Sequence, residues 1–250
     1  MEHRGSRRHV LEWLHADTFI DEFNGLLAPA NAHVSASDTW QPNRNSPVEA
    51  KLSRWGPEVM AGTIDWPAVS AWWLKHGGNT PNWDLVATAT VHGRRGIVLV
   101  EAKANTPELS AAGKRTSKKK VPSKRSLANS KHIAAALEEA RLGLSQVGTP
   151  CRFGIDSHYQ FANRLAFAWK LACQGLPTVL LYLGFIGDRG IRHHFPNAAA
   201  WTETFKAHAR EASIDHLIGR RVDCGRGSTY LLVAEQHVRS MSPPARAPVA

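Results

Sequence analysis

The chain has 250 residues, a hydrophobic fraction of 43% and a formal net charge of +10. That length suffices for a folded domain with its own core, and three cysteines are too few to predict a disulfide framework. No apolar run reaches the roughly 18 residues that span a bilayer, and no apolar stretch of a secretory signal follows the first arginines. We therefore expect a cytoplasmic protein without membrane association.

The N-terminal part is predicted to be helical after a disordered segment at residues 1–7. Apolar residues recur at helical spacing over residues 8–27, which favours one or two amphipathic helices. Residues 28–47 are rich in Ser, Asn, Asp and Pro and are predicted to form a loop, with at most a short strand near His33.

Two further helices are predicted before the first long strand. One starts at Pro47, with Ser46 as N-cap and Glu49 closing a capping box, and it should end before Gly56. The other covers residues 66–75, and its tryptophans are expected to lie in the core rather than stack on bases.

Residues 81–104 are predicted to form a β-hairpin. Two apolar runs rich in β-branched residues, 85–91 and 97–100, are joined by a glycine-containing link of about five residues centred near Arg94. The apolar character of both runs indicates a buried pair of strands.

Two acids and a lysine converge at the end of this hairpin. With the turn near Arg94, Asp84 lies opposite Lys103 or Ala104, and Glu101 lies on a neighbouring diagonal. Glu101 and Lys103 leave the same face, because side chains alternate along a strand. Hard divalent cations prefer such carboxylates, and a lysine nearby can orient a water or offset charge on a phosphate.

In Asp84 and Glu101-Ala102-Lys103 the chain resembles the PD-(D/E)xK nuclease superfamily, in which an acid on one strand precedes an (Asp/Glu)-x-Lys triplet on the next. The resemblance covers about half of the chain, and it departs from the pattern because two residues separate the proline from Asp84. It implies that Asp84, Glu101 and the carbonyl of Ala102 bind Mg²⁺ or Mn²⁺, and that Lys103 positions or activates water.

The same triplet also occurs as Glu49-Ala50-Lys51, after a turn sequence and with no predicted strand to present it. Members of the superfamily sometimes take a third acid from a helix before the hairpin, and Glu49 and Glu58 are the candidates here. For Glu49, the capping role and the metal-binding role both stay open.

A run of cations without any acid follows the hairpin. It consists of Lys114, Arg115, Lys118, Lys119, Lys120, Lys124 and Arg125. Such a run suits a polyanion, because each neutralised phosphate releases condensed counterions, although a solvated loop is the alternative. Its position soon after Lys103 favours a basic loop at 113–126 that holds a nucleic-acid backbone, DNA being the expected partner.

Helices are predicted at 130–144 and 157–175, and the second carries a narrow polar stripe on an otherwise apolar surface. This stripe is either a solvent face or one wall of the cleft, and we favour the cleft. In that position Gln160 would position the attacking water, while Asn163 and Arg164 would reach phosphate.

The remaining elements complete an α/β arrangement. An apolar run at 178–186 predicts an interior strand, followed by a helix at 198–212, a short strand at 229–234 and a flexible tail at 241–250. We therefore predict one α/β domain over 8–240, with a central mixed β-sheet flanked by helices and an N-terminal helical extension. The superfamily resemblance implies a restriction-endonuclease-like core.

The expected function is metal-dependent hydrolysis of nucleic-acid phosphodiester bonds. Two alternatives stay open: a noncatalytic nucleic-acid-binding protein that retains a nuclease-like fold, and an unrelated cytoplasmic metal enzyme. The oligomeric state is open as well, since paired cuts across a duplex would suit a homodimer.

Overall fold

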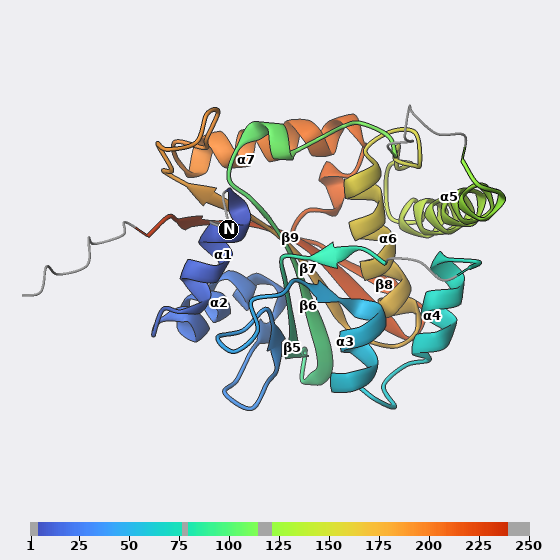
Figure 1. The fold of residues 1–250 in the computed structure, drawn as a ribbon, viewed down its shortest axis with the longest axis horizontal. Helices are drawn as coiled ribbons and strands as arrows, with labels where there is room; N and C mark the ends of the chain where they lie inside the picture. Colours follow the sequence, from blue (N-terminus) through green and yellow to red (C-terminus); the bar gives the residue numbers. More distant parts are fainter. Residues whose placement is uncertain (1–4, 77–79, 115–121, 240–250) are drawn as a thin grey trace, which may run out of the picture.

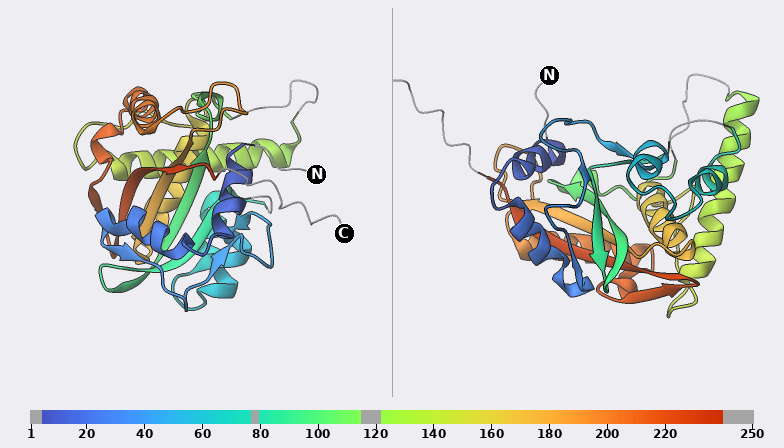
Figure 2. Two further views of the ribbon diagram at one scale, coloured as in Figure 1. Left: turned by 90° about the vertical axis from the view of Figure 1, so that its left-hand side faces the viewer. Right: turned by 90° about the horizontal axis from the view of Figure 1, so that it is seen from below.

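The computed structural model describes residues 5–76, 80–114 and 122–239 and has a mixed α/β fold (Figure 1). A curled mixed sheet forms its centre, and helices lie on both faces of this sheet, as two further views show (Figure 2). The predicted central mixed sheet flanked by helices is confirmed. The tail expected at 241–250 lies outside the described residues.

The central sheet has seven strands: β1 (Ala32–His33), β2 (Trp40–Gln41), β5 (Leu85–Val91), β6 (Arg94–Lys103), β7 (Thr178–Ile186), β8 (Arg221–Cys224) and β9 (Gly227–His237). Their order is β1-β5-β6-β7-β9-β8, and β2 also pairs with β5. β7 runs parallel to both β6 and β9, whereas β5–β6 and β8–β9 are antiparallel. β7 is buried at every position, as predicted for an interior strand.

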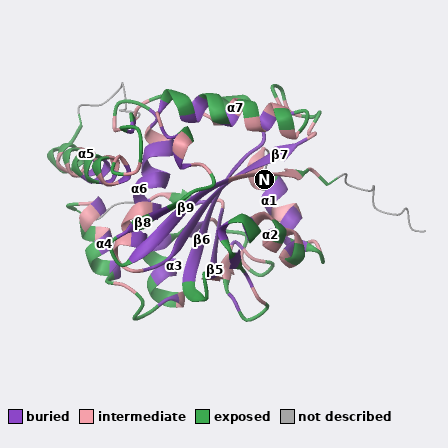
Figure 3. Cartoon of the chain, turned by 180° about the vertical axis from the view of Figure 1, so that it is seen from behind, coloured by how far each residue is buried: buried purple, intermediate pink, exposed green. Residues whose placement is uncertain are grey.

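Alternation along the strands divides their side chains between two hydrophobic cores. In β6, Ile97 and Leu99 pack on one face, while Val98 and Val100 pack on the other, and β7 repeats this alternation. The central strands are accordingly buried on both sides (Figure 3). Because successive side chains point to opposite faces, continuous apolar runs such as these require a helical layer on each face.

One face is covered by helices α1 (Ser6–Leu14) and α2 (Phe19–Leu27), followed by the short 3₁₀ helix η1 (Ala28–Ala30). Both helices follow the predicted amphipathic pattern. Their aromatic residues pack edge to face, with the ring centroids of Trp13 and Phe19 4.8 Å apart.

The disorder expected for residues 1–7 is wrong for residues 6 and 7, which are helical. Helix α1 begins at Ser6, where the guanidinium of Arg7 forms a 2.8 Å ion pair with Glu49. That long-range contact holds the first turn of the helix against the body of the protein. Residues 1–4 lie outside the described part of the chain.

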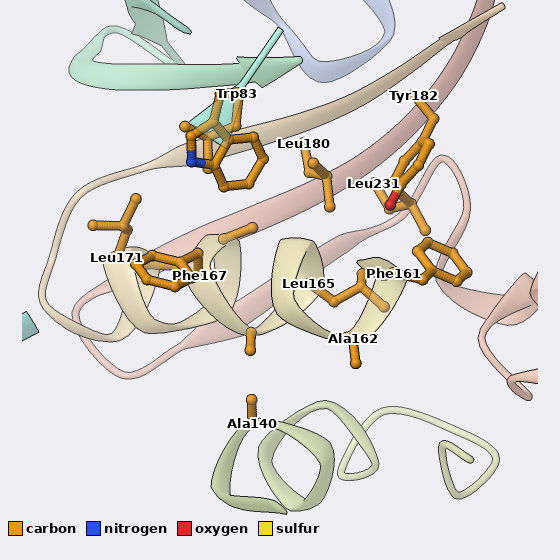
Figure 4. Close-up of a cluster of buried hydrophobic side chains, with 14 of the residues drawn as sticks. Trp83, Ala140, Phe161, Ala162, Leu165, Phe167, Leu171, Leu180, Tyr182 and Leu231 are labelled. Carbon is orange, nitrogen blue, oxygen red and sulfur yellow. The ribbon is translucent and has the colours of Figure 1, made fainter. Parts of the chain in front are cut away.

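The opposite face carries the helices α3 (Leu52–Val59), α4 (Trp66–Trp73), α5 (Lys124–Leu144), α6 (Tyr159–Cys173) and α7 (Ala198–Glu211), with the 3₁₀ helices η2 (Thr106–Glu108) and η3 (Asp215–Leu217). Helix α6 lies between the sheet and α5, with Leu180 on the sheet side and Ala140 on the α5 side (Figure 4). α5 and α6 approach closely because Gly143 has no side chain: a Cβ there would lie 2.4 Å from Trp169.

The helix predicted to start at Pro47 is wrong. Ala50–Lys51 instead forms a short strand, β3, which pairs with β4 (Asn82–Trp83), and α3 starts only at Leu52. Helix α3 also continues past Gly56 to Val59, contrary to the prediction. Gly56 instead lets α3 pack closely on α4, since a Cβ there would lie 2.4 Å from the ring of Trp66.

The hairpin is confirmed, but its turn and register differ from the prediction. His92 and Gly93 alone form the turn, with positive φ angles of 48° and 72°. A two-residue turn with both central residues in this conformation matches the twist of the flanking strands. The pairing of Leu85 with Val100 therefore brings Asp84 towards Glu101 rather than Lys103.

Helix α5 begins six residues earlier than the predicted 130–144, so the last two cations of the basic segment, Lys124 and Arg125, form its first turn. Ser123 caps this end, since its hydroxyl accepts a hydrogen bond from the Ser126 backbone N–H. Within the described ranges, no helix is both long and apolar enough to cross a membrane.

Candidate active site

Asp84 lies at the mouth of the hairpin, between β4 and β5. Its Oδ2 atom accepts a 2.8 Å hydrogen bond from the backbone N–H of Ala102. This bond closes the hairpin at its open end and fixes the Asp84 carboxylate beside the end of β6. The structure thus brings together Asp84, Glu101 and Lys103, as the sequence predicts.

Glu101 and Lys103 leave the same face of β6 and bond to each other. The Lys103 Nζ atom donates a 2.6 Å hydrogen bond to Glu101 Oε1, and the two side chains are only 6% and 2% exposed, respectively. The parallel strand β7 places Tyr182 opposite Glu101. A carboxylate this deeply buried requires charged or hydrogen-bonding partners.

Helix α6 supplies those partners. Gln160 Nε2 donates to Glu101 Oε1 over 2.8 Å, and Arg164 Nε donates to Glu101 Oε2 over 2.5 Å. Arg164 also donates to the side-chain oxygen of Asn163. All three residues line a cavity, so this part of the stripe does not face open solvent. The structure places Arg164 on the acid, whereas the sequence predicts contact with phosphate.

The C-terminal part of the polar stripe contacts helix α5 and not the candidate site. Lys170 forms an ion pair of 2.9 Å with Glu139 of α5, so this part of α6 links the two helices. One stripe therefore divides into a part that faces the site and a part that faces a neighbouring helix.

The two acids have opposite pKa shifts. Burial raises the pKa of Asp84 to about 7, repulsion from Glu101 adds to this, and Lys103 and the Ala102 N–H oppose it. Burial also acts against ionisation of Glu101, but Arg164 and Lys103 outweigh it and hold the pKa of Glu101 below its usual value. Glu101 is thus the ionised acid, and Asp84 is poised to titrate near neutral pH.

A cavity of about 460 Å³ opens onto this cluster and is lined by both acids, Lys103 and Glu49. Glu49 accepts hydrogen bonds from Arg7 and Asn82, at 2.8 and 2.9 Å. The capping role expected for Glu49 is therefore wrong, and its triplet does have a strand, β3. Glu58 pairs with Arg54 and does not line this cavity.

A second cavity of about 680 Å³ adjoins the first, since Asn82, Gln160 and Arg164 line both. Its walls carry the cations Lys51, Lys114 and Arg125. A cavity with basic walls thus adjoins a cavity lined by four acids, Glu49, Asp84, Glu101 and Glu108.

Of the described cations of the basic segment, Lys114 and Arg125 line this second cavity, and Lys124 does not. Lys114 donates a 3.2 Å hydrogen bond to the hydroxyl of Ser130, and Arg125 lies on the first turn of α5. Arg115, Lys118, Lys119 and Lys120 lie outside the described residues.

The donor set suits a hard divalent cation. The acids offer carboxylate oxygens, Ala102 lines the same cavity, and Asp84 Oδ1 has no hydrogen bond to any described residue. Both oxygens of Glu101 are already bonded, to Lys103 and Gln160 on one side and to Arg164 on the other. A cation between the acids would relieve the repulsion that raises the pKa of Asp84, and Glu101 Oε2, which accepts a single hydrogen bond, retains a lone pair for it.

Sequence reasoning missed several residues of the site: Arg7, Asn82, Trp83, Glu108 and Tyr182. Trp83 stacks under the guanidinium of Arg164, 4.7 Å from its ring, and Glu108 accepts a hydrogen bond from the Ala104 N–H. Strand alternation could have identified Trp83, because it must point away from Asp84. No sequence signal marks the pairing of β3 with β4 that brings Asn82 to Glu49.

Comparison with known proteins finds no match: no family model, no curated protein and no solved structure is significantly similar to the chain.

Proposed function

We propose that this chain is a metal-dependent nuclease that hydrolyses phosphodiester bonds of nucleic acid, DNA in the first instance. The proposal includes a PD-(D/E)xK site within a restriction-endonuclease-like core. One observation carries it: Asp84, Glu101 and Lys103 converge at a cavity that adjoins a second, cation-lined cavity.

Asp84 and Glu101, with the carbonyl of Ala102, would hold Mg²⁺ or Mn²⁺. When bound, such a cation supplies Lewis-acid polarisation of the phosphate and a more acidic water. Lys103 would donate a hydrogen bond to the attacking water or to the phosphate oxygen on which charge develops. Gln160 would orient Glu101 through its bond to Oε1, and Arg164 would keep Glu101 ionised through its bond to Oε2.

The substrate would enter from the side of the larger cavity. Lys51, Lys114 and Arg125 line that cavity, next to Gln160 and Arg164. Cations in a cavity next to the cleavage site would bind the phosphates that flank the scissile bond, and they would make binding strongly dependent on salt.

A noncatalytic nucleic-acid-binding protein is the second candidate, favoured by one specific observation. Both oxygens of Glu101 accept hydrogen bonds, from Lys103, Gln160 and Arg164, so protein groups alone already compensate the buried charge of the carboxylate. In that case the buried ion pairs would stabilise the fold, and the basic cavity would retain the binding function.

The test is cleavage of plasmid and of end-labelled single- and double-stranded DNA with Mg²⁺ or Mn²⁺. We expect wild-type cleavage that EDTA abolishes, and at least about a hundredfold loss in Asp84→Asn, because an amide replaces the anionic ligand. Glu58→Gln is the matched control, since Glu58 is an acid that lies outside the cavity. Equal cleavage by wild type and Asp84→Asn would refute the site, and salt-dependent binding without cleavage would select the second candidate.

A further inference from the structure

A second cluster of ligand-type side chains lies at the junction of α6 and α7. His158 is the residue just before α6, and His208 and Glu211 lie in the last turn of α7. One ligand atom from each of the three residues lies within 4.8 Å of the others. The ring centroids of His158 and His208 are 4.9 Å apart.

The two imidazoles are buried without adequate hydrogen-bonding partners. His158 Nδ1 is buried and unpaired, and the side chain of His208 has no hydrogen bond within the part of the chain that the structure describes. The only polar link in the cluster is a long contact of 3.4 Å between His158 Nε2 and Glu211. Buried polar groups are almost always bonded, so the buried Nδ1 of His158 lacks a partner, whereas the nitrogens of His208 are not fully enclosed by protein.

The surrounding residues hold both rings in position. His158 has a left-handed backbone conformation, with φ of 50°, and its N–H donates to the Ala111 carbonyl. The ring of His208 stacks on Phe161 at 5.1 Å. Glu211, in contrast, has a side chain that is 63% exposed and free to change rotamer. The site therefore has two fixed nitrogen ligands and one adjustable oxygen ligand.

We propose that His158, His208 and Glu211 form a binding site for a divalent transition metal of the zinc class, separate from the cavity of Asp84 and Glu101. Imidazole nitrogens favour Zn²⁺ over Mg²⁺, which prefers oxygen ligands. Ligand atoms of a tetrahedral zinc site lie about 3.4 Å apart, so shifts of about 1 Å would complete the site. Because the Glu211 side chain is largely exposed, a water molecule would supply the fourth ligand.

The electrostatic environment supports this assignment. Burial lowers the pKa of His208 to about 4, His158 and Lys103 act in the same direction, and Glu211 opposes them. His208 is therefore neutral at pH 7, which is the form that binds a metal.

A metal here would tie the start of α6 to the end of α7. Gln160 and Arg164, which bond Glu101, lie on the first turns of α6 directly after His158. The metal would therefore fix the helix that forms the wall of the candidate active site. This structural role does not depend on nuclease activity.

The test is metal titration of the whole chain after removal of bound metal with EDTA. Co²⁺ is followed by the visible absorption of a tetrahedral site and Zn²⁺ by calorimetry. We expect the absorption of tetrahedral Co²⁺ to titrate as one saturable site, equally in wild type and in Asp84→Asn, because Asp84 belongs to the other cavity. His208→Gln and Glu211→Gln should each weaken binding at least about tenfold, since each removes a ligand. Zn²⁺ should raise the melting temperature of wild type but not of Glu211→Gln.

His33→Gln and Glu203→Gln are the matched controls, because both residues are exposed and lie outside the cluster. Their metal affinity should equal that of wild type. Should His208→Gln fail to fold in EDTA, Glu211→Gln decides alone, since its side chain is largely exposed. Absence of the Co²⁺ bands in wild type, or wild-type affinity in Glu211→Gln, would overturn the proposal.

Discussion

The chain contains the triplet Glu-Ala-Lys twice, and the two copies have different environments. Glu101-Ala102-Lys103 ends the central strand β6, where Glu101 is 2% exposed and bonded to two cations. In the other copy, Glu49 directly precedes the short strand β3, formed by Ala50 and Lys51, which pairs with β4. There the Glu49 side chain is 26% exposed and Lys51 is exposed. Both glutamates nevertheless line the same cavity. Identical residues thus give a buried charge network in one copy and a solvated rim in the other.

The largest expected difference between the copies is in stability. Glu101→Gln leaves Lys103 and Arg164 buried without their anionic partner, so we expect the free energy of unfolding to fall by about 3–5 kcal/mol. Glu49→Gln loses a partly exposed ion pair, which is worth about 1 kcal/mol or less. Urea denaturation of both variants measures the two losses. Equal losses would show that burial does not distinguish the copies.

The two lysines should differ in what they contribute to the proposed activity. Lys103→Met should reduce cleavage about a hundredfold or more at unchanged DNA affinity, because it removes a donor at the reacting phosphate. Lys51→Met should weaken DNA binding a fewfold and reduce its salt dependence, because Lys51 lines the larger cavity. Single-turnover cleavage and binding at several salt concentrations separate the two effects. The comparison would fail if Lys51→Met reduced cleavage as strongly as Lys103→Met.

A third prediction concerns the pH dependence of stability. Asp84 has a pKa of about 7 in the folded protein against 3.8 as its ordinary value. Between these values the folded state keeps a proton that the unfolded state has released, so stability falls as pH rises from about 4 to 7. The slope is at most about 1.4 kcal/mol per pH unit, and partial solvent contact of Asp84 reduces it.

Urea denaturation between pH 4 and 7 should therefore show a smaller fall with rising pH in Asp84→Asn than in wild type. Glu49→Gln is the control, and it should keep the wild-type slope. An unchanged slope in Asp84→Asn would contradict the raised pKa.

The smallest expected effect is the energetic coupling between helix α1 and Glu49 of the second Glu-Ala-Lys triplet. Arg7 and Glu49 form a 2.8 Å ion pair that is partly exposed on both sides. A double-mutant cycle with Arg7→Ala and Glu49→Ala should give a coupling energy of about 0.5 kcal/mol, which decreases in high salt. A coupling near zero would mean that apolar packing alone holds α1 in place.

The sequence predicts the parts of the fold that rest on strong patterns. The hairpin strands and β7 have long apolar runs, and burial in the structure follows those runs. In α6, by contrast, Asn163 and Arg164 of the polar stripe are buried. The predicted register of the hairpin is wrong because His92 takes a positive φ angle, which gives a two-residue turn. That conformation is uncommon outside glycine, and the sequence gives no sign of it.

Other parts of the structure depend on contacts between distant segments. β3 and β4 have two residues each, too few to form a periodic pattern, and only their pairing explains why Glu49 reaches the cavity of Asp84. Likewise, His158 and His208 lie on different helices and have no metal-ligand spacing in the sequence. Convergence of this kind follows from the tertiary fold, which local propensity does not encode.

The parallel pairing of β6 with β7 has a consequence for the order of assembly. Glu101 and Lys103 precede their partners Gln160, Arg164 and Tyr182 by the whole of α5 and its connections. During synthesis the hairpin of β5 and β6 can form from local contacts, but its neighbour β7 is still to be made. We therefore expect the nascent chain to carry its acids and lysine unassembled until β7 leaves the ribosome, so that the site forms only on a nearly finished sheet.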